Sequence, residues 1–454
     1  MPRELFFDHA LLPSGWARDV RIGVADGAIT AVTAGAARDG AERLDGIAVA
    51  GLPNLHCHAF QRGMAGLAER RGPQADSFWT WREVMYRFLE RLTPDDVEAI
   101  AAFAYVEMLE AGFTTVGEFH YLHHDADGRP YADIGEMAAR IAAASAETRI
   151  GLTLLPSFYA YGGFGGAAPS PGQRRFLNDP DRFLKLVERC RAIAASLPAA
   201  RVGIAPHSLR AVTPETLRAV CQAAPDGPIH IHAAEQTKEV DECVAALGSR
   251  PVQWLIDHAG LDARWCVVHA THTTEQEIRA LAASGAVAGL CPLTEASLGD
   301  GIFDGADYLA AGGRFGIGTD SNIQIDAAAE LRQLEYAQRL ARRSRNVMTV
   351  QEGESTGRRL IDAALAGGAQ ALRRPIGALA ARLRADIVLL DGSHPDLGAR
   401  RDDQWLDAWI FVAGRAAVKT VLMGGEAVVE TGRHRLRPAI EGRYRRAVAN
   451  LAAA

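Results

Sequence analysis

Hydrophobic and polar residues alternate in short runs at both ends of the chain, a period typical of half-buried β-strands. Near the start, such runs lie at residues 5–12, 20–24 and 29–32, with a turn at Asp26-Gly27. Near the end, they lie at residues 386–391, 409–413, 418–423 and 426–431, the last two joined by Gly424-Gly425. We expect residues 1–50 and 380–454 to form one small β-sandwich domain built from both termini.

Between these ends, short apolar runs alternate with longer stretches of helical period. The runs lie at residues 49–56, 114–119, 149–156, 201–206, 228–232, 265–269, 286–291 and 314–319. One helix between them is clearly marked, with Thr93 as its N-cap, Pro94 in its first turn and Gly112 as its stop. Eight such units over residues 51–379 predict a (β/α)8 barrel of the TIM type. An open doubly wound sheet would more often carry a glycine-rich phosphate turn, and no GxGxxG opens a helix here.

Two connections in the predicted barrel are unusually long for βα loops. Residues 59–92 include the run Phe78-Trp-Thr-Trp-Arg82, and residues 157–178 are rich in glycine and proline. Both connections follow strands, so they lie at the catalytic face of a barrel. They are consistent with binding walls or a lid, and the second is also consistent with a passive flexible excursion.

Composition narrows the class of protein. Of 454 residues, 48% are hydrophobic and 23% are charged, which is ordinary for globular chains. Acidic residues (55) exceed Lys plus Arg (49), so a nucleic-acid partner is not expected. We find neither a signal peptide nor an apolar run long enough for a membrane span. Six cysteines form no CxxC pair, which favours reduced thiols and a cytoplasmic location.

Histidines and a carboxylate stand at the ends of four predicted barrel strands. His56 and His58 close the first strand, and residues two apart in a strand point to the same side, so both imidazoles face the barrel axis. His232 ends the fifth strand, His269 the sixth and Asp320 the eighth. Because the carboxyl ends of barrel strands share one face, we expect these side chains to meet there.

A metal site is the natural interpretation of this group. The predicted ligands are three imidazoles and one carboxylate, namely His56, His58, His232 and Asp320. This set suits zinc, with iron or manganese as alternatives, and such a cation lowers the pKa of bound water to about 7. Glu235 and His269 remain as proton-transfer groups, which is a hydrolytic arrangement. His230 has the parity of His232 but sits deeper, so we expect it to be an interior histidine.

The barrel and the flanking sheet domain together resemble the amidohydrolase superfamily in its deaminase-like branch. The superfamily pattern consists of the HxH pair, the HxxE after the fifth strand, the sixth-strand histidine and the eighth-strand aspartate. Three longer segments, residues 51–66, 77–88 and 330–340, are similar to the formimidoylglutamate deiminases of that branch. The departures are Cys57 between the histidines, and Asn322 where a bulkier polar residue is expected.

The resemblance implies hydrolysis of N-formimino-L-glutamate to N-formyl-L-glutamate and ammonia, a step of histidine breakdown. In the implied mechanism, metal-bound hydroxide attacks the formimino carbon, Asp320 takes the proton of the water with help from His269, and Glu235 passes a proton to the leaving nitrogen. The matching positions that contact substrate are Gln61, Arg82, Tyr121, His207 and Arg210. The two arginines suit the two carboxylates of this substrate, and Arg82 has aromatic neighbours on which a guanidinium can stack.

Two other functions stay open at this stage. An aminohydrolase for a purine or another cyclic amidine, such as guanine, would share the metal set but would need a neutral, aromatic-lined pocket. A metal-binding scaffold without turnover would keep the ligands but usually lose the proton-transfer groups Glu235 and His269.

The lysines bear on the number of metal ions. Binuclear members of the superfamily bridge two metals with a carboxylated lysine at the end of the fourth strand, and that strand contains no lysine here. The chain has only three lysines, Lys185, Lys238 and Lys419, and each lies elsewhere. We therefore expect one divalent cation per chain.

The resemblance also implies a homodimer. Four apolar positions are consistent either with the core or with a subunit contact: Leu331, Leu334, Tyr336 and Leu340.

Overall fold

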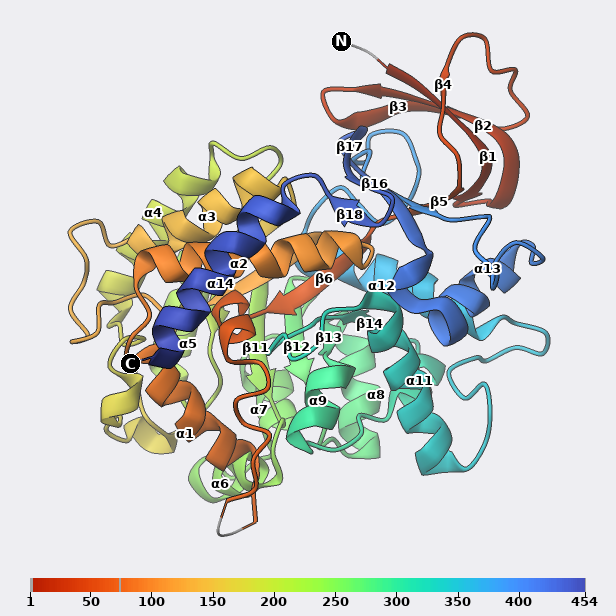
Figure 1. Ribbon diagram of the computed structural model, residues 1–454. Coiled ribbons are helices and arrows are strands. Elements are labelled where there is room, and N and C mark those ends of the chain that lie inside the picture. The colour runs from red at the N-terminus through yellow and green to blue at the C-terminus, as the bar shows by residue number, and fades with distance from the viewer. Residues whose placement is uncertain (1–2, 73–74, 454) are drawn as a thin grey trace.

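The computed structural model describes residues 3–72 and 75–453. The parts of the two predicted domains at residues 1–2, 73–74 and 454 lie outside the described residues. The described chain forms two sheets (Figure 1). One is a sheet of strands from both termini, and the other is a parallel barrel wrapped by helices. The predicted fold class is confirmed.

The terminal sheet has the strand order β18-β17-β16-β15-β5-β1-β2-β3, with β4 paired to β1. Its strands are β1 (Arg3–Leu12), β2 (Gly15–Ala25), β3 (Ala28–Thr33), β4 (Glu42–Arg43), β5 (Ile47–Ala50), β15 (Ile387–Leu390), β16 (Val418–Met423), β17 (Glu426–Glu430) and β18 (Arg433–His434). The two chain ends meet where β15 pairs antiparallel with β5. Buried apolar residues on these central strands, such as Ile47 and Leu390, join this sheet to the main hydrophobic core.

Residues 409–413 do not form the predicted strand, and that prediction was wrong. Helix α13 (Asp403–Ala408) continues into η4 (Trp409–Ala413), a π-helical turn, and then into η5 (Gly414–Ala417). Trp409 and Ile410 are both buried, whereas Val412 is 63% exposed. Two consecutive buried residues followed by an exposed one fit a helical turn better than the alternation of a strand. Short apolar runs are ambiguous between the two structures.

The barrel strands are β6 (Leu52–Cys57), β7 (Phe113–His120), β8 (Gly151–Phe158), the fragments β9 (Arg201–Val202) and β10 (Ala205–Pro206), β11 (Ile229–Ala233), β12 (Trp265–His269), β13 (Val287–Leu290) and β14 (Arg314–Ile317). Their pairing is parallel throughout. Two isolated bridges close the barrel between its fourth strand (β9 and β10) and its fifth strand (β11). They pair Ile204 with Ile229 and Ser208 with His232. The first predicted barrel strand, residues 49–56, is divided at Gly51. Its first part belongs to β5 of the terminal sheet and its second part to β6 of the barrel.

Helices cover the outside of the barrel. They are α2 (Pro94–Glu110), α3 (Glu136–Thr148), α4 (Pro180–Ala194), α5 (Pro214–Ala223), α6 (Thr237–Leu247), α7 (Pro251–His258), α8 (Glu275–Ser284), α9 (Pro292–Leu298), α10 (Gly305–Ala310), α11 (Ala327–Arg342) and α12 (Thr356–Leu372). Helix α2 begins as predicted, because the Thr93 hydroxyl accepts the Asp96 backbone N–H. A helix that the sequence did not predict, α14 (Arg437–Ala453), lies across α2 (Figure 1), where Tyr444 stacks on Phe103 with ring centroids 4.1 Å apart.

The two long connections contain short helices and pack against each other. The first holds η1 (Ala59–Met64) and α1 (Phe78–Leu89), and the second holds η2 (Phe164–Gly166) and η3 (Pro171–Gln173). Arg175 of the second connection is 3% exposed and donates hydrogen bonds to the carbonyl groups of Leu89, Leu92 and His124. This arginine fastens the end of the second connection to the end of α1, whereas the glycine-rich residues 162–171 of that connection are exposed or half-buried.

Of the four apolar residues on α11, Leu331 and Leu334 are buried, whereas Tyr336 is 39% exposed and Leu340 is 79% exposed. The first two therefore belong to the core. All six cysteines are free thiols. None of the helices in the described part of the chain combines the length and the apolar character that a bilayer crossing needs.

Candidate active site

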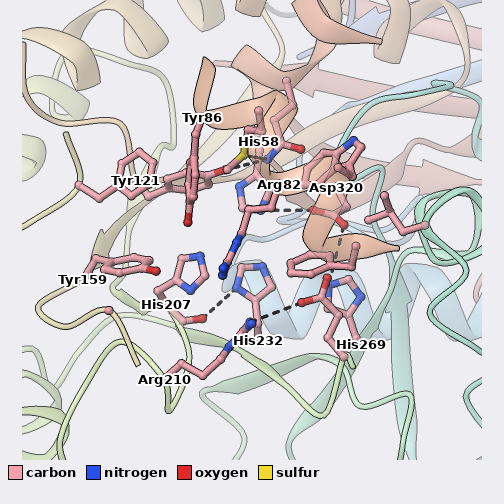
Figure 2. Close-up of a pocket in the computed structure, with 18 residues that line it drawn as sticks. His58, Arg82, Tyr86, Tyr121, Tyr159, His207, Arg210, His232, His269 and Asp320 are labelled. Atoms are coloured by element: carbon pink, nitrogen blue, oxygen red, sulfur yellow. Dashed lines mark hydrogen bonds and ion pairs between the residues drawn. The ribbon is translucent and has the colours of Figure 1, made fainter. Parts of the chain in front are cut away.

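A cavity opens at the carboxyl ends of the barrel strands (Figure 2). Its lining includes each residue that the sequence placed on the substrate: Gln61, Arg82, Tyr121, His207 and Arg210. It also includes most of the predicted metal and proton-transfer groups: His58, His232, Glu235, His269 and Asp320. His56 is fully buried and lies directly behind them. The fold thus brings all eleven predicted side chains to one place.

The four predicted metal ligands form one cluster, with their ligand atoms all within 4.8 Å of one another. The Nε2 atoms of His56 and His58 lie 3.3 and 3.2 Å from Asp320 Oδ1. His232 Nε2 lies 3.1 Å from His56 Nε2. Three imidazole nitrogens and a carboxylate oxygen that face one another this closely fit a shared divalent cation.

Backbone carbonyl groups orient two of these imidazoles. His58 Nδ1 lies 2.8 Å from the carbonyl oxygen of Phe119, and His232 Nδ1 lies 2.8 Å from that of His207. A carbonyl oxygen accepts only from a protonated ring nitrogen, so Nδ1 carries the proton in both rings and Nε2 is left with a free lone pair. Both lone pairs face the centre of the cluster, which is the state that a metal ligand requires.

Several ligand-bearing strand ends turn sharply. His269 has φ +68°, Asp320 +42° and Asn322 +57°, all in the left-handed region. This region is uncommon for residues other than glycine, and such backbone strain gathers at functional sites. Here it redirects the chain immediately after β12 and β14 while their last side chains stay at the cavity.

A polar network connects β6 to β14, whose pairing in the described part of the chain consists of Asn54 with Ile317. Asn54 Nδ2 donates to the Thr319 hydroxyl at 2.7 Å, and that hydroxyl donates to Asn322 Oδ1 at 2.7 Å. Asn322 Nδ2 then donates to the carbonyl groups of His58 and Asp320, each at 3.0 Å. Asn322 therefore supports the backbone of two predicted metal ligands from outside the cluster.

His269 and Glu235 lie beside the cluster as a facing pair. His269 Nε2 is 3.7 Å from Glu235 Oε1 and 3.9 Å from Asp320 Oδ2, while its Nδ1 is 3.2 Å from Glu295 Oε1. Burial alone would lower the pKa of His269, but Glu235, Glu295 and Asp320 together raise it to about 10. Burial raises the pKa of Glu235 to about 7, although His269 and Arg210 act against this. A carboxyl group with a pKa near neutrality suits a proton shuttle.

The two arginines are held mainly by aromatic rings. Figure 2 shows both reaching toward the histidines, Arg82 from α1 and Arg210 from the loop after β10. The Arg82 guanidinium carbon lies 4.6 Å from the ring centroid of Trp79 and 5.5 Å from that of Tyr86. Within the described residues, Arg82 Nε and two nitrogens of Arg210, Nε and Nη1, are buried without a hydrogen-bond partner. These N–H groups are available for ligand carboxylates.

The remaining predicted contacts are neutral and polar. Gln61 Nε2 donates to the Tyr121 hydroxyl at 2.7 Å. Burial lowers the pKa of His207 well below its ordinary value, and the charge of Arg210 lowers it further. The His207 imidazole is therefore neutral beside the arginines.

Sequence reasoning missed several residues of the site. Glu295, on α9, positions His269, and its place soon after the seventh strand was a usable signal. The rings of Tyr86, Tyr159 and Phe176 line the cavity but carry no pattern that marks them in the sequence. Asp300, which accepts a hydrogen bond from Gln236, lies in a loop without a motif.

Comparisons with known proteins agree with this geometry. The profile of the Amidohydrolase family matches residues 47–428, and that of the N-terminal domain of formimidoylglutamate deiminase HutF matches residues 4–46. A formimidoylglutamate deiminase from Pseudomonas aeruginosa is 53% identical over 434 residues, which is 95% of each chain. A 5-methylthioadenosine/S-adenosylhomocysteine deaminase from Natronomonas pharaonis is 29% identical over 85% of this chain and 81% of its own.

Two solved structures are also similar. The crystal structure of an amidohydrolase from Brucella melitensis has a TM-score of 0.95 and 54% identity, over 99% of this chain and all of that one. An adenosine deaminase from Xanthomonas campestris with bound zinc has a TM-score of 0.82 at 21% identity, over 99% of this chain and 98% of that one, and shows the likeness of fold alone.

Proposed function

The chain belongs to the amidohydrolase family, and from this premise we propose that it hydrolyses N-formimino-L-glutamate to N-formyl-L-glutamate and ammonia. The observation that carries the proposal is the presence of two guanidinium groups, Arg82 and Arg210, in the same cavity as the metal-type cluster. A substrate with two carboxylates needs two such partners. The 53% identity to a formimidoylglutamate deiminase supports the same substrate.

We propose that one divalent cation, zinc in the first place with iron or manganese as alternatives, is held by His56, His58, His232 and Asp320. When bound, such a cation supplies an activated water for attack on the formimino carbon. Glu295 and the carbonyl groups behind His58 and His232 keep the surrounding imidazoles in fixed orientations.

The reaction adds water to the formimino carbon and then breaks its bond to the terminal nitrogen, so both protons of the water end on ammonia. Asp320 Oδ1 faces the ligand histidines, while Oδ2 faces His269 Nε2. Oδ2 is thus placed to accept the first proton, and His269 stabilises the resulting charge. Glu235 Oε1 faces the same nitrogen of His269 at 3.7 Å, and this carboxyl group is placed to deliver a proton to the leaving nitrogen.

The substrate carboxylates are proposed to bind Arg82 and Arg210, with Gln61, Tyr121 and His207 as neutral contacts. Each charge-assisted bond contributes about 1.5–3 kcal/mol. Replacement of either arginine by methionine should lower kcat/KM at least tenfold for the glutamate derivative. The loss should be much smaller for a formimino compound that lacks one carboxylate. Equal losses with both compounds would remove the arginines from these roles.

A second candidate is an aminohydrolase for a cyclic amidine such as guanine. The aromatic rings along the cavity favour it, among them Tyr86, Tyr159 and Phe176. Among the residues that the structure describes, neither guanidinium group has a carboxylate within 3.5 Å. This opposes the second candidate, because a neutral heterocycle does not match two such cations.

Release of ammonia from N-formimino-L-glutamate, measured beside guanine and cytosine, separates these functions. We expect turnover of the first compound only. Turnover of guanine or cytosine without the first would establish the second candidate, and tight metal binding with no turnover of any compound would indicate a scaffold.

We also propose that the chain forms a homodimer. The exposed apolar residues Leu340 and Val412 support this, since surfaces of this kind favour association. Sedimentation equilibrium of the purified protein tests it, and a monomer at micromolar concentration would contradict it.

A further inference from the structure

Three cationic side chains converge on one indole ring, that of Trp79 on α1. The guanidinium carbon of Arg82 lies 4.6 Å from the Trp79 ring centroid, and that of Arg210 lies 5.6 Å from it. The ammonium nitrogen of Lys238 lies 4.6 Å from the same centroid. These three cations come from α1, from the loop after β10 and from α6. Trp79 lies beside the cavity, outside the residues that line it, and contacts three separate segments of the chain, two of which carry the cavity arginines.

Among the described residues, the indole of Trp79 is the aromatic ring on which both guanidinium groups pack. Arg210 approaches the carboxylate of Glu235 only to 3.7 Å, and it packs within 5.9 Å of the Phe78 ring centroid. Arg82 forms no ion pair among the described residues and packs on Trp79 and Tyr86. Contact through the face of a guanidinium leaves its N–H edge free for a carboxylate.

We infer that Trp79 is a positioning residue that fixes the separation of the two guanidinium groups and thereby selects the length of the dicarboxylate. The inference rests on the proposed function. Because both guanidinium carbons lie close to the same rigid ring, their separation cannot exceed the two distances taken together. An indole has only two side-chain torsions, so it holds this separation at a low entropic cost.

Lys238 is the third cation on the Trp79 ring and stands outside the residues that line the cavity. Its side chain is 58% exposed, and its other partner is Glu242 at 3.7 Å. Three positive charges around one ring repel one another, and a dianionic ligand offsets that repulsion. Helix α6 begins two residues after Glu235, so the contact of Lys238 with Trp79 also ties α1 to the segment that carries this carboxylate.

The test compares N-formimino-L-glutamate with N-formimino-L-aspartate, which is shorter by one methylene group. Trp79→Leu should lower kcat/KM for the glutamate derivative at least tenfold, mainly through KM. It should also lower at least fivefold the ratio of kcat/KM for the glutamate derivative to kcat/KM for the aspartate derivative. Trp79→Phe, which keeps an aromatic face, should restore that ratio to within twofold of the wild type. Trp16→Leu is the matched control, because Trp16 is half-buried but packs on Trp405 in the other domain.

An unchanged ratio in Trp79→Leu, with activity on both substrates lowered equally, would overturn the inference and leave Trp79 a purely structural role. A wild-type enzyme that does not hydrolyse N-formimino-L-glutamate would instead refute the proposed function, so the two failures are distinguishable. If Trp79→Leu does not fold, Lys238→Met decides. It should raise KM at least threefold and lower the ratio, and behaviour equal to that of the exposed-lysine control Lys185→Met would overturn the inference.

Discussion

Asn322 contacts the backbone of the predicted metal cluster without belonging to the cluster. Its side-chain amide is fully buried and donates to the carbonyl groups of His58 and Asp320, and its own backbone is left-handed. Asparagine tolerates that conformation better than alanine does, so one substitution removes both the hydrogen bonds and the backbone preference.

Asn322→Ala should therefore weaken metal binding about tenfold or more, the usual effect of losing support behind a ligand. Metal competition with a chelator measures this. Asn346→Ala is the control, because Asn346 has a similar φ of +52° but is exposed and far along the chain from the cluster. Equal metal affinity in the two variants would mean that the ligand backbone does not depend on Asn322.

Substitution of Glu235 separates metal binding from proton transfer. Its pKa of about 7, raised by burial, suits proton transfer, and it is not among the four clustered ligands. Glu235→Gln should retain metal and lower kcat by a factor on the order of 10² or more. Steady-state kinetics with metal analysis measures both quantities. Glu277→Gln, at an equally buried carboxylate on α8, should change kcat less than twofold. Full turnover by Glu235→Gln would assign the proton shuttle to another group.

At the residue scale, the sequence predicted the position of a side chain where the two-residue period of a strand determines it. The parity of His56 and His58 places both on the cluster, and His230 is an interior residue whose Nε2 lies 2.9 Å from the Ala371 carbonyl oxygen. Sequence reasoning did not find the contact of Glu295 with His269 or that of Arg210 with Trp79, because these pairs are far apart in the sequence and meet only when the helices and loops pack.

At the scale of elements, the turns after the strands carry the strain of the site. Ala270 follows β12 with φ +49°, a conformation that costs an alanine roughly 1 kcal/mol relative to glycine. Ala270→Gly removes this strain but adds a similar entropy to the unfolded chain. We expect a Tm that is unchanged or slightly raised in a thermal melt. Ala288→Gly, at a buried position inside β13, should lower the Tm. A large loss of stability in Ala270→Gly would mean that the turn is not strained.

The elements themselves were predictable to an unequal degree. The eight barrel strands and α2 have strong local patterns, and the structure has them within a few residues of their predicted bounds. Helices α1 and α14 and the π-helical turn at Trp409–Ala413 were not predicted. Their apolar residues, such as Tyr444 against Phe103, are partnered across long sequence separations, which a local pattern does not report.

At the scale of the whole molecule, the number of metal ions is the sharpest prediction. A second potential group, His269, Cys291 and Asp320, shares Asp320 with the first. The fourth barrel strand ends at Pro206 and His207, so it offers no lysine that could bridge two metal ions. We expect metal analysis to approach one equivalent per chain, with activity saturating there. Chelation should lower the Tm, because a ligand of the folded state stabilises it. A requirement for two equivalents would contradict this expectation.

The pairing of β15 with β5 has a consequence for how the chain is made. Strand β5 is complete once residue 50 has left the ribosome, but its partner begins at Ile387. At about 5–20 residues per second, the edge of β5 waits on the order of tens of seconds while the whole barrel is synthesised. The four residues of β5, Ile47–Ala50, are all buried in the folded protein. While their strand edge is exposed, it is a template for pairing with a wrong strand. The nascent chain is therefore most exposed to aggregation before residues 387–390 emerge, and a chaperone that shields the amino-terminal sheet during that interval would raise the yield of folded enzyme.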